Sequence, residues 1–302
     1  MTFIGGRELS SADGSARIHE RGYRRYDGAR LGRAHAVRSL ARHTLQRILG
    51  LRRPARYKIL PFLSVIFAYL PAAVFVGVIA LLPNAGSDAR IAYDRYYGFV
   101  TGAIFLFVTF VAPEALCPDR RWRSLSLYLA SPLDRATYLL AKAIAVVGAL
   151  LLVTIGPLLL LLIGYVLENN GPHGPWNVVL TIGRIVGAGV VLSLAYASLS
   201  MAVSSFTDRR AFAGAGTFLI LTLSQALSGF FVFGLNMSRY FSLLSVTRTP
   251  VLLVQHFYGT RVFVDDRRVD LPTWSLALTC ALVTLAASAT VYARYRRVQV
   301  TR

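Results

Sequence analysis

Six stretches of about 20 apolar residues recur along the chain, and they constrain its fold more than any other feature. They cover residues 59–82, 98–116, 138–167, 185–206, 211–235 and 274–293. A helix rising about 1.5 Å per residue needs this length to cross a hydrocarbon core of roughly 30 Å. A membrane β-barrel would show short alternating segments instead, and LLVTIGPLLLLLIGYVL is apolar on every side. The sequence therefore predicts an all-α, polytopic integral membrane protein with six transmembrane helices.

Composition agrees with this prediction and excludes a water-soluble domain. Hydrophobic residues make up 55% of the chain and charged residues only 16%, whereas soluble domains carry about 25% charged residues. The excess apolar side chains must face the lipid bilayer. The formal net charge of +19 would suggest a nucleic-acid partner in a soluble protein. In a membrane protein it indicates basic cytoplasmic loops, so we expect no nucleic-acid partner.

The distribution of the basic residues predicts the orientation. With six spans, both termini and the second and fourth connections share one face, which holds 25 of the 33 lysines and arginines, against 8 on the opposite face. Basic loops stay on the cytoplasmic side. We therefore expect a multi-pass protein of the cytoplasmic (plasma) membrane with both termini in the cytoplasm.

The segment before the first span divides into two parts. Residues 1–34 are polar and glycine-rich, and we expect a mobile cytoplasmic N-terminus there. Residues 35–58 predict a basic amphipathic helix at the membrane interface, or alternatively a solvated helix that docks against nothing. Its apolar face would carry Val37, Leu40, Ala41, Thr44, Ile48 and Leu51, and Arg38, Arg42, Gln46 and Arg53 would point away. At the other end, residues 294–302 form a short cytoplasmic tail.

The loop between the second and third spans, CPDRRWRSLSLYLASPLDRATYLLAK, predicts a short cytoplasmic helix from Asp119 to Ala130. Asp119 would cap it, and Pro132 would end it. Trp122, Leu125 and Leu129 recur at helical spacing, with Arg120, Arg121 and Arg123 directed to the cytoplasm. Such a helix, tethered to a span at both ends, is suited to transmit force from a docked partner. The alternative is an interfacial turn that only contributes positive charge.

Two further features concern backbone geometry. Gly156-Pro157, in the middle of the long third span, predicts a kink. In the outer loop, residues 236–272, the piece TPVLLVQHFYG is too short to span and favours a re-entrant or interfacial helix. After it, RVFVDDRRVDL alternates around Asp265-Asp266 as a small hairpin does. This region could form an outer lid or an ordinary loop.

The sequence carries no recognisable catalytic motif. GxSxG, HExxH and GxxxxGK[ST] are absent, and the five histidines are scattered. We therefore expect no catalytic residues, no metal site and no enzyme activity from this chain. Charged groups within spans are costly and become functional candidates. Glu114 and Lys142 are the charged candidates, with Glu114 expected to pair with Lys142 or Arg120. Ser224 and Gln225 are the neutral candidates, able to bind another helix or line a path.

The loop after the second span resembles that of the membrane permease subunits of type-2 ATP-binding-cassette (ABC) exporters. Those loops carry an acidic residue and arginine, then leucines, Ser-Pro, a tyrosine, and Gly-Lys opening span three. The residues that match in order and spacing are Asp119, Arg120, Arg121, Leu125, Leu127, Leu129, Ser131, Pro132, Leu133, Tyr138 and Lys142. Arg123-Ser124 replaces the usual Gly-Thr, and Ala141 replaces the glycine before the lysine. The six-span plan, the amphipathic helix and the wide outer loop extend the resemblance over most of the chain beyond residue 35.

The resemblance implies a function and partners. Such permeases carry no cofactor of their own, and ATP and Mg²⁺ bind to a separate ABC ATPase subunit that docks beneath the loop helix. This chain would be half of a pore, most simply a homodimer, exporting a substrate. The residues implied in coupling are Asp119, Arg120, Arg121, Trp122, Leu125, Leu129, Ser131 and Pro132. Two alternatives from other classes are a six-span scaffold or signalling protein without transport, and a membrane-embedded enzyme acting on lipid. The enzyme is disfavoured because Glu114 has no second acid–base group beside it in the sequence.

Overall fold

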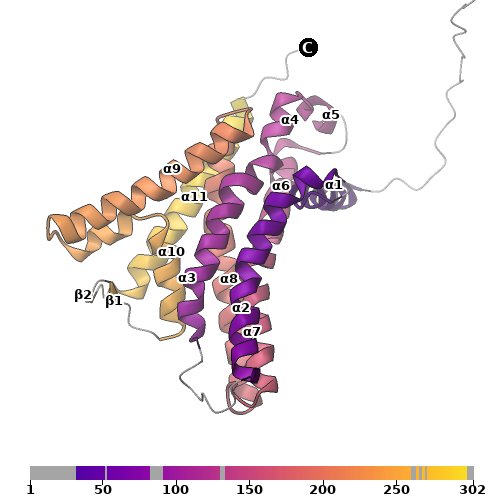
Figure 1. Cartoon of the computed structure of the whole chain (residues 1–302). Coiled ribbons are helices and arrows are strands. Elements are labelled where there is room, and N and C mark those ends of the chain that lie inside the picture. The colour runs from indigo at the N-terminus through magenta and orange to yellow at the C-terminus, as the bar shows by residue number, and fades with distance from the viewer. Residues whose placement is uncertain are drawn as a thin grey trace, which may run out of the picture. The chain divides into compact units, whose positions relative to one another are not determined.

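The computed structural model describes residues 32–51, 53–81, 91–129, 133–259, 263–264, 267–268 and 271–297 (Figure 1). Within these ranges, six helical segments are long and apolar enough to cross a membrane. They are Ile59–Leu81, Tyr93–Arg121, Arg135–Leu167, Pro175–Ser204, Arg210–Gly234 and Thr273–Arg297. The predicted all-α polytopic membrane fold is confirmed. Most of the predicted N-terminal segment, residues 1–31, lies outside the described residues, as do Ser131, Pro132, Asp265, Asp266 and the end of the tail.

Several spans are built from more than one element. The first is α2 (Ile59–Leu81), the fourth is α8 (Pro175–Ser204) and the sixth is α11 (Thr273–Arg297). The second joins α3 (Tyr93–Leu106), the π-helix η3 (Phe107–Val111), the 3-10 helix η4 (Ala112–Ala115) and α4 (Cys117–Arg121). The third joins α6 (Arg135–Thr154) to α7 (Gly156–Leu167), and the fifth joins α9 (Arg210–Gly229) to the π-helix η5 (Phe230–Gly234).

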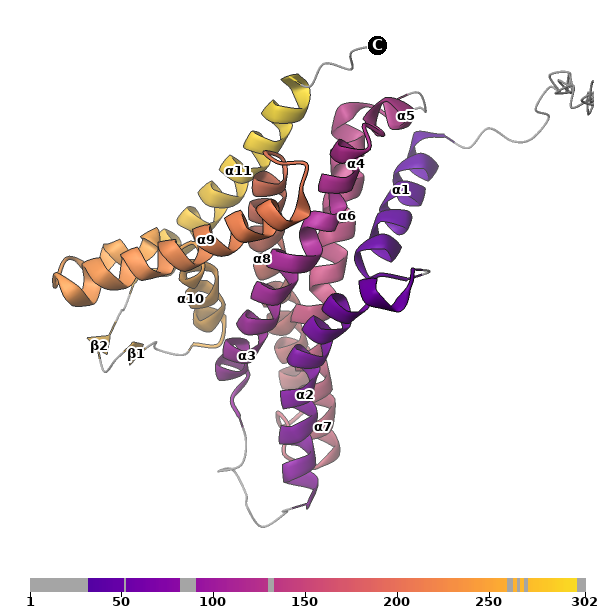
Figure 2. The ribbon, with the colours of Figure 1, turned by 45° about the horizontal axis from the view of Figure 1, so that its top comes forward.

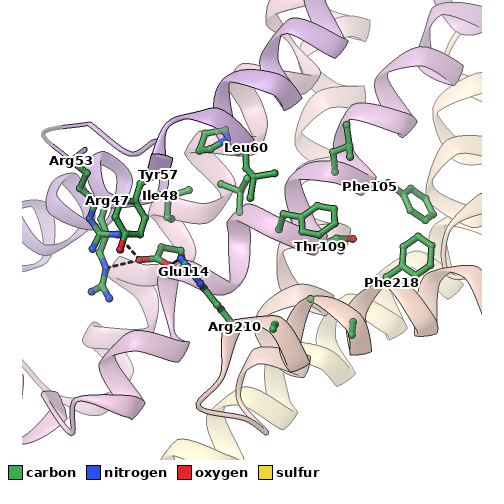
Figure 3. A pocket seen from close by; sticks show the side chains of 17 residues that line it. Arg47, Ile48, Arg53, Tyr57, Leu60, Phe105, Thr109, Glu114, Arg210 and Phe218 are labelled. Carbon is green, nitrogen blue, oxygen red and sulfur yellow. Dashed lines mark hydrogen bonds and ion pairs between the residues drawn. The ribbon is translucent and has the colours of Figure 1, made fainter. Parts of the chain in front are cut away.

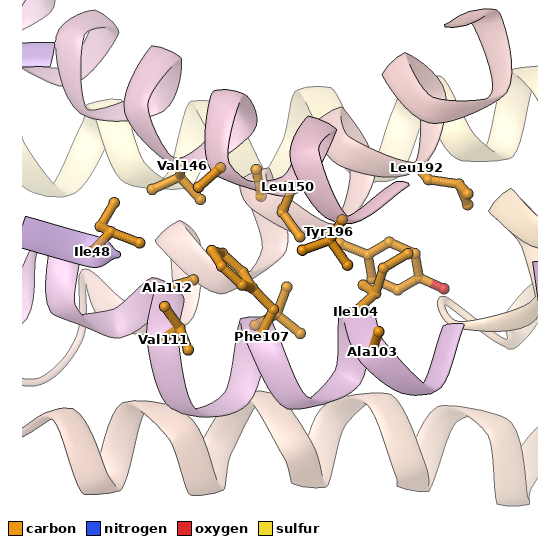
Figure 4. Close-up of a cluster of buried hydrophobic side chains, with 14 of the residues drawn as sticks. Ile48, Ala103, Ile104, Phe107, Val111, Ala112, Val146, Leu150, Leu192 and Tyr196 are labelled. Carbon is orange, nitrogen blue, oxygen red and sulfur yellow. The ribbon is translucent and has the colours of Figure 1, made fainter. Parts of the chain in front are cut away.

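The core forms where the second, third and fourth spans meet, around η3, α6 and α8. Phe107, Leu150 and Tyr196 are buried there among smaller aliphatic side chains (Figure 4). The Tyr196 hydroxyl donates to the Thr247 carbonyl oxygen at 2.7 Å, which satisfies a polar group in a dry environment. Small residues let the backbones approach, as membrane helices require. At Gly189 of α8, for example, a Cβ atom would lie 2.3 Å from the Ile155 side chain.

At the predicted kink, the third span is divided at Ile155 into α6 and α7. Pro157 has no N–H to continue the helical hydrogen-bond ladder, and helix α6 ends at Thr154. Tyr69 of α2 donates its hydroxyl to the Leu152 carbonyl oxygen at 3.0 Å, close to the break. A Cβ atom on Gly156 would lie 1.7 Å from that hydroxyl oxygen. Glycine at 156 therefore allows the tyrosine of one span to bind the kinked backbone of another.

The predicted amphipathic helix is α1 (Arg33–Ile48), and it packs against α6. Leu40, Thr44 and Ile48 are buried, so within the described residues the helix is docked rather than merely solvated. Leu51 was expected on the same face but is exposed, because the helix ends before it. Gly50 adopts φ +67°, and a Cβ atom there would lie 2.6 Å from the Tyr57 carbonyl oxygen. This glycine turns the chain back toward the start of α2 through the 3-10 helix η1 (Ala55–Tyr57).

The outer loop contains the predicted short helix, α10 (Arg248–Phe257), preceded by the 3-10 helix η6 (Arg239–Leu244). Helix α10 packs against α8 and α11, with Leu252, Leu253 and Val254 buried. The predicted hairpin is also present, as β1 (Phe263–Val264) paired antiparallel with β2 (Arg267–Arg268). The loop is therefore folded against the spans.

Helix α9 diverges from α2 and α3 along its length, as both ribbon views show (Figures 1 and 2). Its first turns pack against η3 and α8, and its far end contacts η6. Beyond the first turns, Leu219 and Leu223 are exposed on its surface, as is Phe230 of η5. The fifth span consequently buries the smallest share of its side chains among the described spans.

Candidate functional site

A buried carboxylate, Asp119 of α4, binds three side chains from two other helices. Its Oδ1 accepts from the Arg47 guanidinium of α1 at 2.7 Å. Its Oδ2 lies 2.6 Å from Lys142 Nζ and accepts from the Tyr138 hydroxyl at 2.9 Å, both on α6. Asp119 is only 3% exposed, so its charge is stabilised by these partners rather than by water. The cluster joins α1, α4 and α6 where the second span ends and the third begins.

Aromatic rings complete the surroundings of Lys142, whose side chain is 1% exposed. The ammonium lies 5.6 Å from the Tyr128 ring of α5 (Leu125–Leu129) and 5.5 Å from the Tyr138 ring. Both distances suit cation–π attraction. Tyr138 also packs against Tyr295 of α11, with ring centroids 6.0 Å apart. Helix α4 at the end of the second span and α5 after it are thereby fixed to α6 and, through the rings, to α11.

A second acidic centre, Glu114 of η4, binds arginines from three directions (Figure 3). Its Oε1 accepts from Arg53 Nη1 at 2.7 Å and lies 3.5 Å from Arg47 Nε. Its Oε2 lies 3.3 Å from Arg210 Nη1 at the start of α9. Arg47 therefore bridges both carboxylates. Burial acts to lower the pKa of Arg47, but Asp119 and Glu114 outweigh it and hold that pKa above its ordinary value.

The π-helix η3 precedes Glu114 in the chain, and contacts of its backbone with α8 and α9 hold it in position. Ser200 of α8 donates its hydroxyl to the Val108 carbonyl oxygen at 3.0 Å. Helix α9 approaches the Thr109 carbonyl so closely that a Cβ atom on Gly214 would lie 2.3 Å from its oxygen. Segments of π-helix often occur at functional sites because they shift the register of the residues that follow. Here the register change precedes both Glu114 and Asp119.

The segment from Cys117 to Leu129 also presents an exposed surface. We call it the coupling segment, after the role that the sequence resemblance implies for it. Trp122 is 75% exposed and Leu127 is 76% exposed. Arg121 is also exposed, and its guanidinium lies 5.9 Å from the Trp122 ring. An exposed aromatic residue beside a cation is a typical composition for a protein-binding surface.

The structure corrects the expected shape of this segment. The single helix predicted from Asp119 to Ala130 is two short helices, α4 and α5, separated by a turn at Arg123 with φ +50°. Asp119 does not act as the predicted N-cap, because its carboxylate is occupied by Arg47, Lys142 and Tyr138. Arg120 is not free to face the cytoplasm, since its Nε lies 3.3 Å from the Asp208 carboxylate.

The expected ion pairs are also corrected. Glu114 pairs with neither Lys142 nor Arg120, because each of those cations has a nearer carboxylate. Lys142 is instead buried against Asp119. Arg53, predicted to point away from the amphipathic helix, binds Glu114 after the turn at Gly50 reverses the chain.

The remaining predicted residues are not brought into this cluster. Ser224 donates to the Leu221 carbonyl oxygen of its own helix at 3.0 Å, and Gln225 lies exposed on α9. Leu125 is half-buried within α5, and Leu129 is its last residue. Ser131 and Pro132 lie outside the described residues.

Sequence reasoning missed three arginines of the site. Arg47 adjoins the buried face of α1, next to Ile48 and three positions after Thr44, so its flanking position was an available signal. Arg53 and Arg210 lie at the starts of two spans, where basic residues are common for reasons of topology. Their convergence on Glu114 depends on packing between segments far apart in sequence.

These features define a class of protein, an all-helical membrane protein with six spans. From the end of its second span, the short helices α4 and α5 present an exposed surface, and buried ion pairs hold them in place. Residues 79–288 match the family described as "ABC-2 family transporter protein". The match covers more than half of the chain, so the chain belongs to this family of membrane transporters. The resemblance to type-2 ABC permeases is thereby confirmed. No curated protein matches the chain.

Proposed function

We propose that the protein is the permease subunit of an ABC transporter that exports a substrate across the cytoplasmic membrane, using ATP hydrolysed by a separate subunit. The observation that carries this proposal is the coupling segment. Its exposed Trp122 follows the buried Asp119 by three residues, and its exposed Leu127 adjoins Tyr128, whose ring contacts Lys142. Family membership supports the transport function.

The buried ion pairs of Asp119 give the coupling segment the stiffness that force transmission requires. A partner that pushes on Trp122 would act on α4, whose Asp119 is held by α1 and α6 at 2.6–2.9 Å. Arg47 connects this centre to Glu114, and Glu114 connects it to the first turn of α9 through Arg210. Displacement of the segment would therefore reach spans two, three and five together.

The proposed ATPase partner can be sought by purifying the tagged, full-length chain from the cells that produce it. We expect a second, ATP-hydrolysing polypeptide to copurify, with a complex mass that accommodates two copies of each subunit. The exposed apolar surfaces of α2 and α9 are available to a second permease copy or to lipid. A chain that is recovered without ATP hydrolysis under mild detergent conditions would favour the scaffold alternative.

The proposed orientation has a separate test. A reporter that is active only outside the cytoplasm should be active when fused after Asn170, in the turn between α7 and α8. It should be silent when fused after Arg209, which precedes α9. The reason is the 25-to-8 distribution of basic residues, which favours the α1 end of the spans as the cytoplasmic one. Activity at Arg209 with silence at Asn170 would reverse the proposed topology.

A further inference from the structure

A cavity of about 820 Å³ lies between the start of α2, the η3–η4 region and the first turns of α9. It is partly open, and its volume falls within the roughly 300–1,000 Å³ typical of small-molecule sites. It lies where α9 begins to diverge from α2 and α3 (Figure 2). The cavity is distinct from the exposed surface of the coupling segment, although both adjoin the same ion pairs.

The two ends of the cavity differ in chemistry (Figure 3). Arg47, Arg53 and Arg210 lie at one end with Glu114. Phe105 and Phe218 lie at the other end, and the wall between is completed by apolar residues such as Leu60. A ligand that satisfies both ends must carry a polar, charged group and a hydrocarbon part.

The charged end has a surplus of positive charge. Three arginines face one glutamate among the residues that line the cavity, and Glu114 cannot neutralise them all. Arg47 has Asp119 as a second partner, whereas Arg210 is bound through the longer 3.3 Å contact and is 58% exposed. Arginine presents a planar set of donors suited to carboxylate and phosphate groups. An anionic head group placed here would complete the neutralisation.

Between Arg210 and Phe218, the wall contributed by α9 is built from small side chains. Ala211, Gly214 and Ala215 line the cavity, and the close approach of Gly214 to the Thr109 carbonyl leaves no room for a larger residue at that position. Ala215 is exposed, so its methyl group borders open space. The apolar part of the cavity is therefore open because small residues of α9 face it.

We propose that this cavity binds an amphiphile with an anionic phosphate or carboxylate head and a hydrocarbon tail. The head binds Arg210 and Arg53, and the tail lies along Leu60 and between Phe105 and Phe218. This proposal names a class of ligand for the proposed permease. Only the transport of that ligand rests on the proposed function. Binding itself requires neither ATPase nor nucleotide.

The test measures binding to the purified full-length chain in non-ionic detergent, with no ATPase present. The probe is radiolabelled palmitoyl lysophosphatidic acid, competed with palmitoyl lysophosphatidylcholine or with glycerol 3-phosphate. We expect the zwitterionic lipid to compete at least tenfold less well than the unlabelled anionic lipid. Glycerol 3-phosphate should not compete in the same concentration range, because it has no tail.

Two variants address the two ends of the cavity. Arg210→Gln should weaken binding of the anionic lipid about tenfold, while its neighbour Arg209→Gln, which does not line the cavity, should leave binding unchanged. Ala215→Phe should weaken binding by a similar factor by filling the tail region. Leu219→Phe is its control, since Leu219 is exposed on α9 and does not line the cavity. Size-exclusion profiles establish that all four variants are folded.

Three results would overturn the proposal. Equal competition by glycerol 3-phosphate would reduce the cavity to a site for small anions. Equal competition by the zwitterionic lipid would mean that the arginines do not select the head group. Unchanged binding by Arg210→Gln and Ala215→Phe, with both proteins folded, would place the lipid elsewhere. None of these results depends on whether an ATPase copurifies. The proposed ligand and the proposed permease function can therefore be refuted independently of each other.

Discussion

Asp119→Asn is expected to destabilise the folded protein much more than Lys142→Met. Asp119 accepts from Arg47, Lys142 and Tyr138 in a site where it is 3% exposed. An asparagine offers one acceptor oxygen, and its NH₂ group, a donor, must then face a cation or a hydroxyl. Removing one partner of a buried ion pair costs about 3–5 kcal/mol because the remaining charge is uncompensated. In this variant Arg47 and Lys142 lose the negative charge that they share, and Arg47 keeps its contact with Glu114.

Lys142→Met is the matched comparison. It removes a buried cation, but Asp119 keeps the Arg47 and Tyr138 contacts, and methionine fills a similar volume between the Tyr128 and Tyr138 rings. We expect Asp119→Asn to lower the apparent Tm and the yield of monodisperse protein sharply, and Lys142→Met to lower them modestly. Thermal unfolding of the purified proteins in one detergent measures both. A larger loss for Lys142→Met would show that the ammonium, rather than the carboxylate, organises the cluster.

The double variant Arg121→Glu with Trp122→Ala is expected to abolish ATPase copurification and export while leaving the permease stable. Both side chains are exposed, and Trp122 loses little intramolecular packing when truncated. Exposed aromatic and arginine residues dominate many protein interfaces, where single truncations cost about 2 kcal/mol or more. A charge reversal adds like-charge repulsion against a carboxylate-bearing partner. The variant should reach normal membrane levels with an unchanged Tm.

Arg38→Glu is the control for this prediction. Arg38 is exposed on α1, so its reversal gives the same charge change at the same end of the spans, outside the coupling segment. It should retain the ATPase. The structure also explains why Arg120 is left unchanged: it pairs with Asp208, and its reversal would disturb the contact between α4 and the turn before α9. If the double variant still binds the ATPase and exports normally, the coupling segment is not the docking surface.

Much of the architecture could be predicted because it follows from local rules of hydrophobicity and backbone chemistry. Six apolar stretches identified the spans, the Gly156-Pro157 pair identified the break in the third span, and the spacing of Leu40, Thr44 and Ile48 identified the buried face of α1. The short outer helix and the hairpin could also be predicted from the sequence. Each of these depends on residues that are neighbours in sequence.

The partners of the charged residues could not be predicted in the same way. Arg47 is 72 positions from Asp119, and Arg210 is 96 positions from Glu114. The sequence identified Glu114 and Lys142 as costly groups within spans, and it predicted that Glu114 pairs with Lys142 or Arg120. In the structure, the turn at Gly50 and the register shift of η3 bring Arg53 and Arg47 to the carboxylates instead.

By itself, the sequence determined that this chain spans a membrane six times as helices, because lipid leaves backbone polar groups no partner outside the helix. It also located the segment between spans two and three, through residues whose order and spacing resemble those of ABC permeases. Only the tertiary structure decided which charges meet and where the spans part to leave a cavity. The physical reason is that a buried charge pairs with the opposite charge that packing brings near it, and the contacts between helices far apart in sequence decide which charge that is. The cavity likewise depends on how α9 packs against η3 at Gly214 and then diverges.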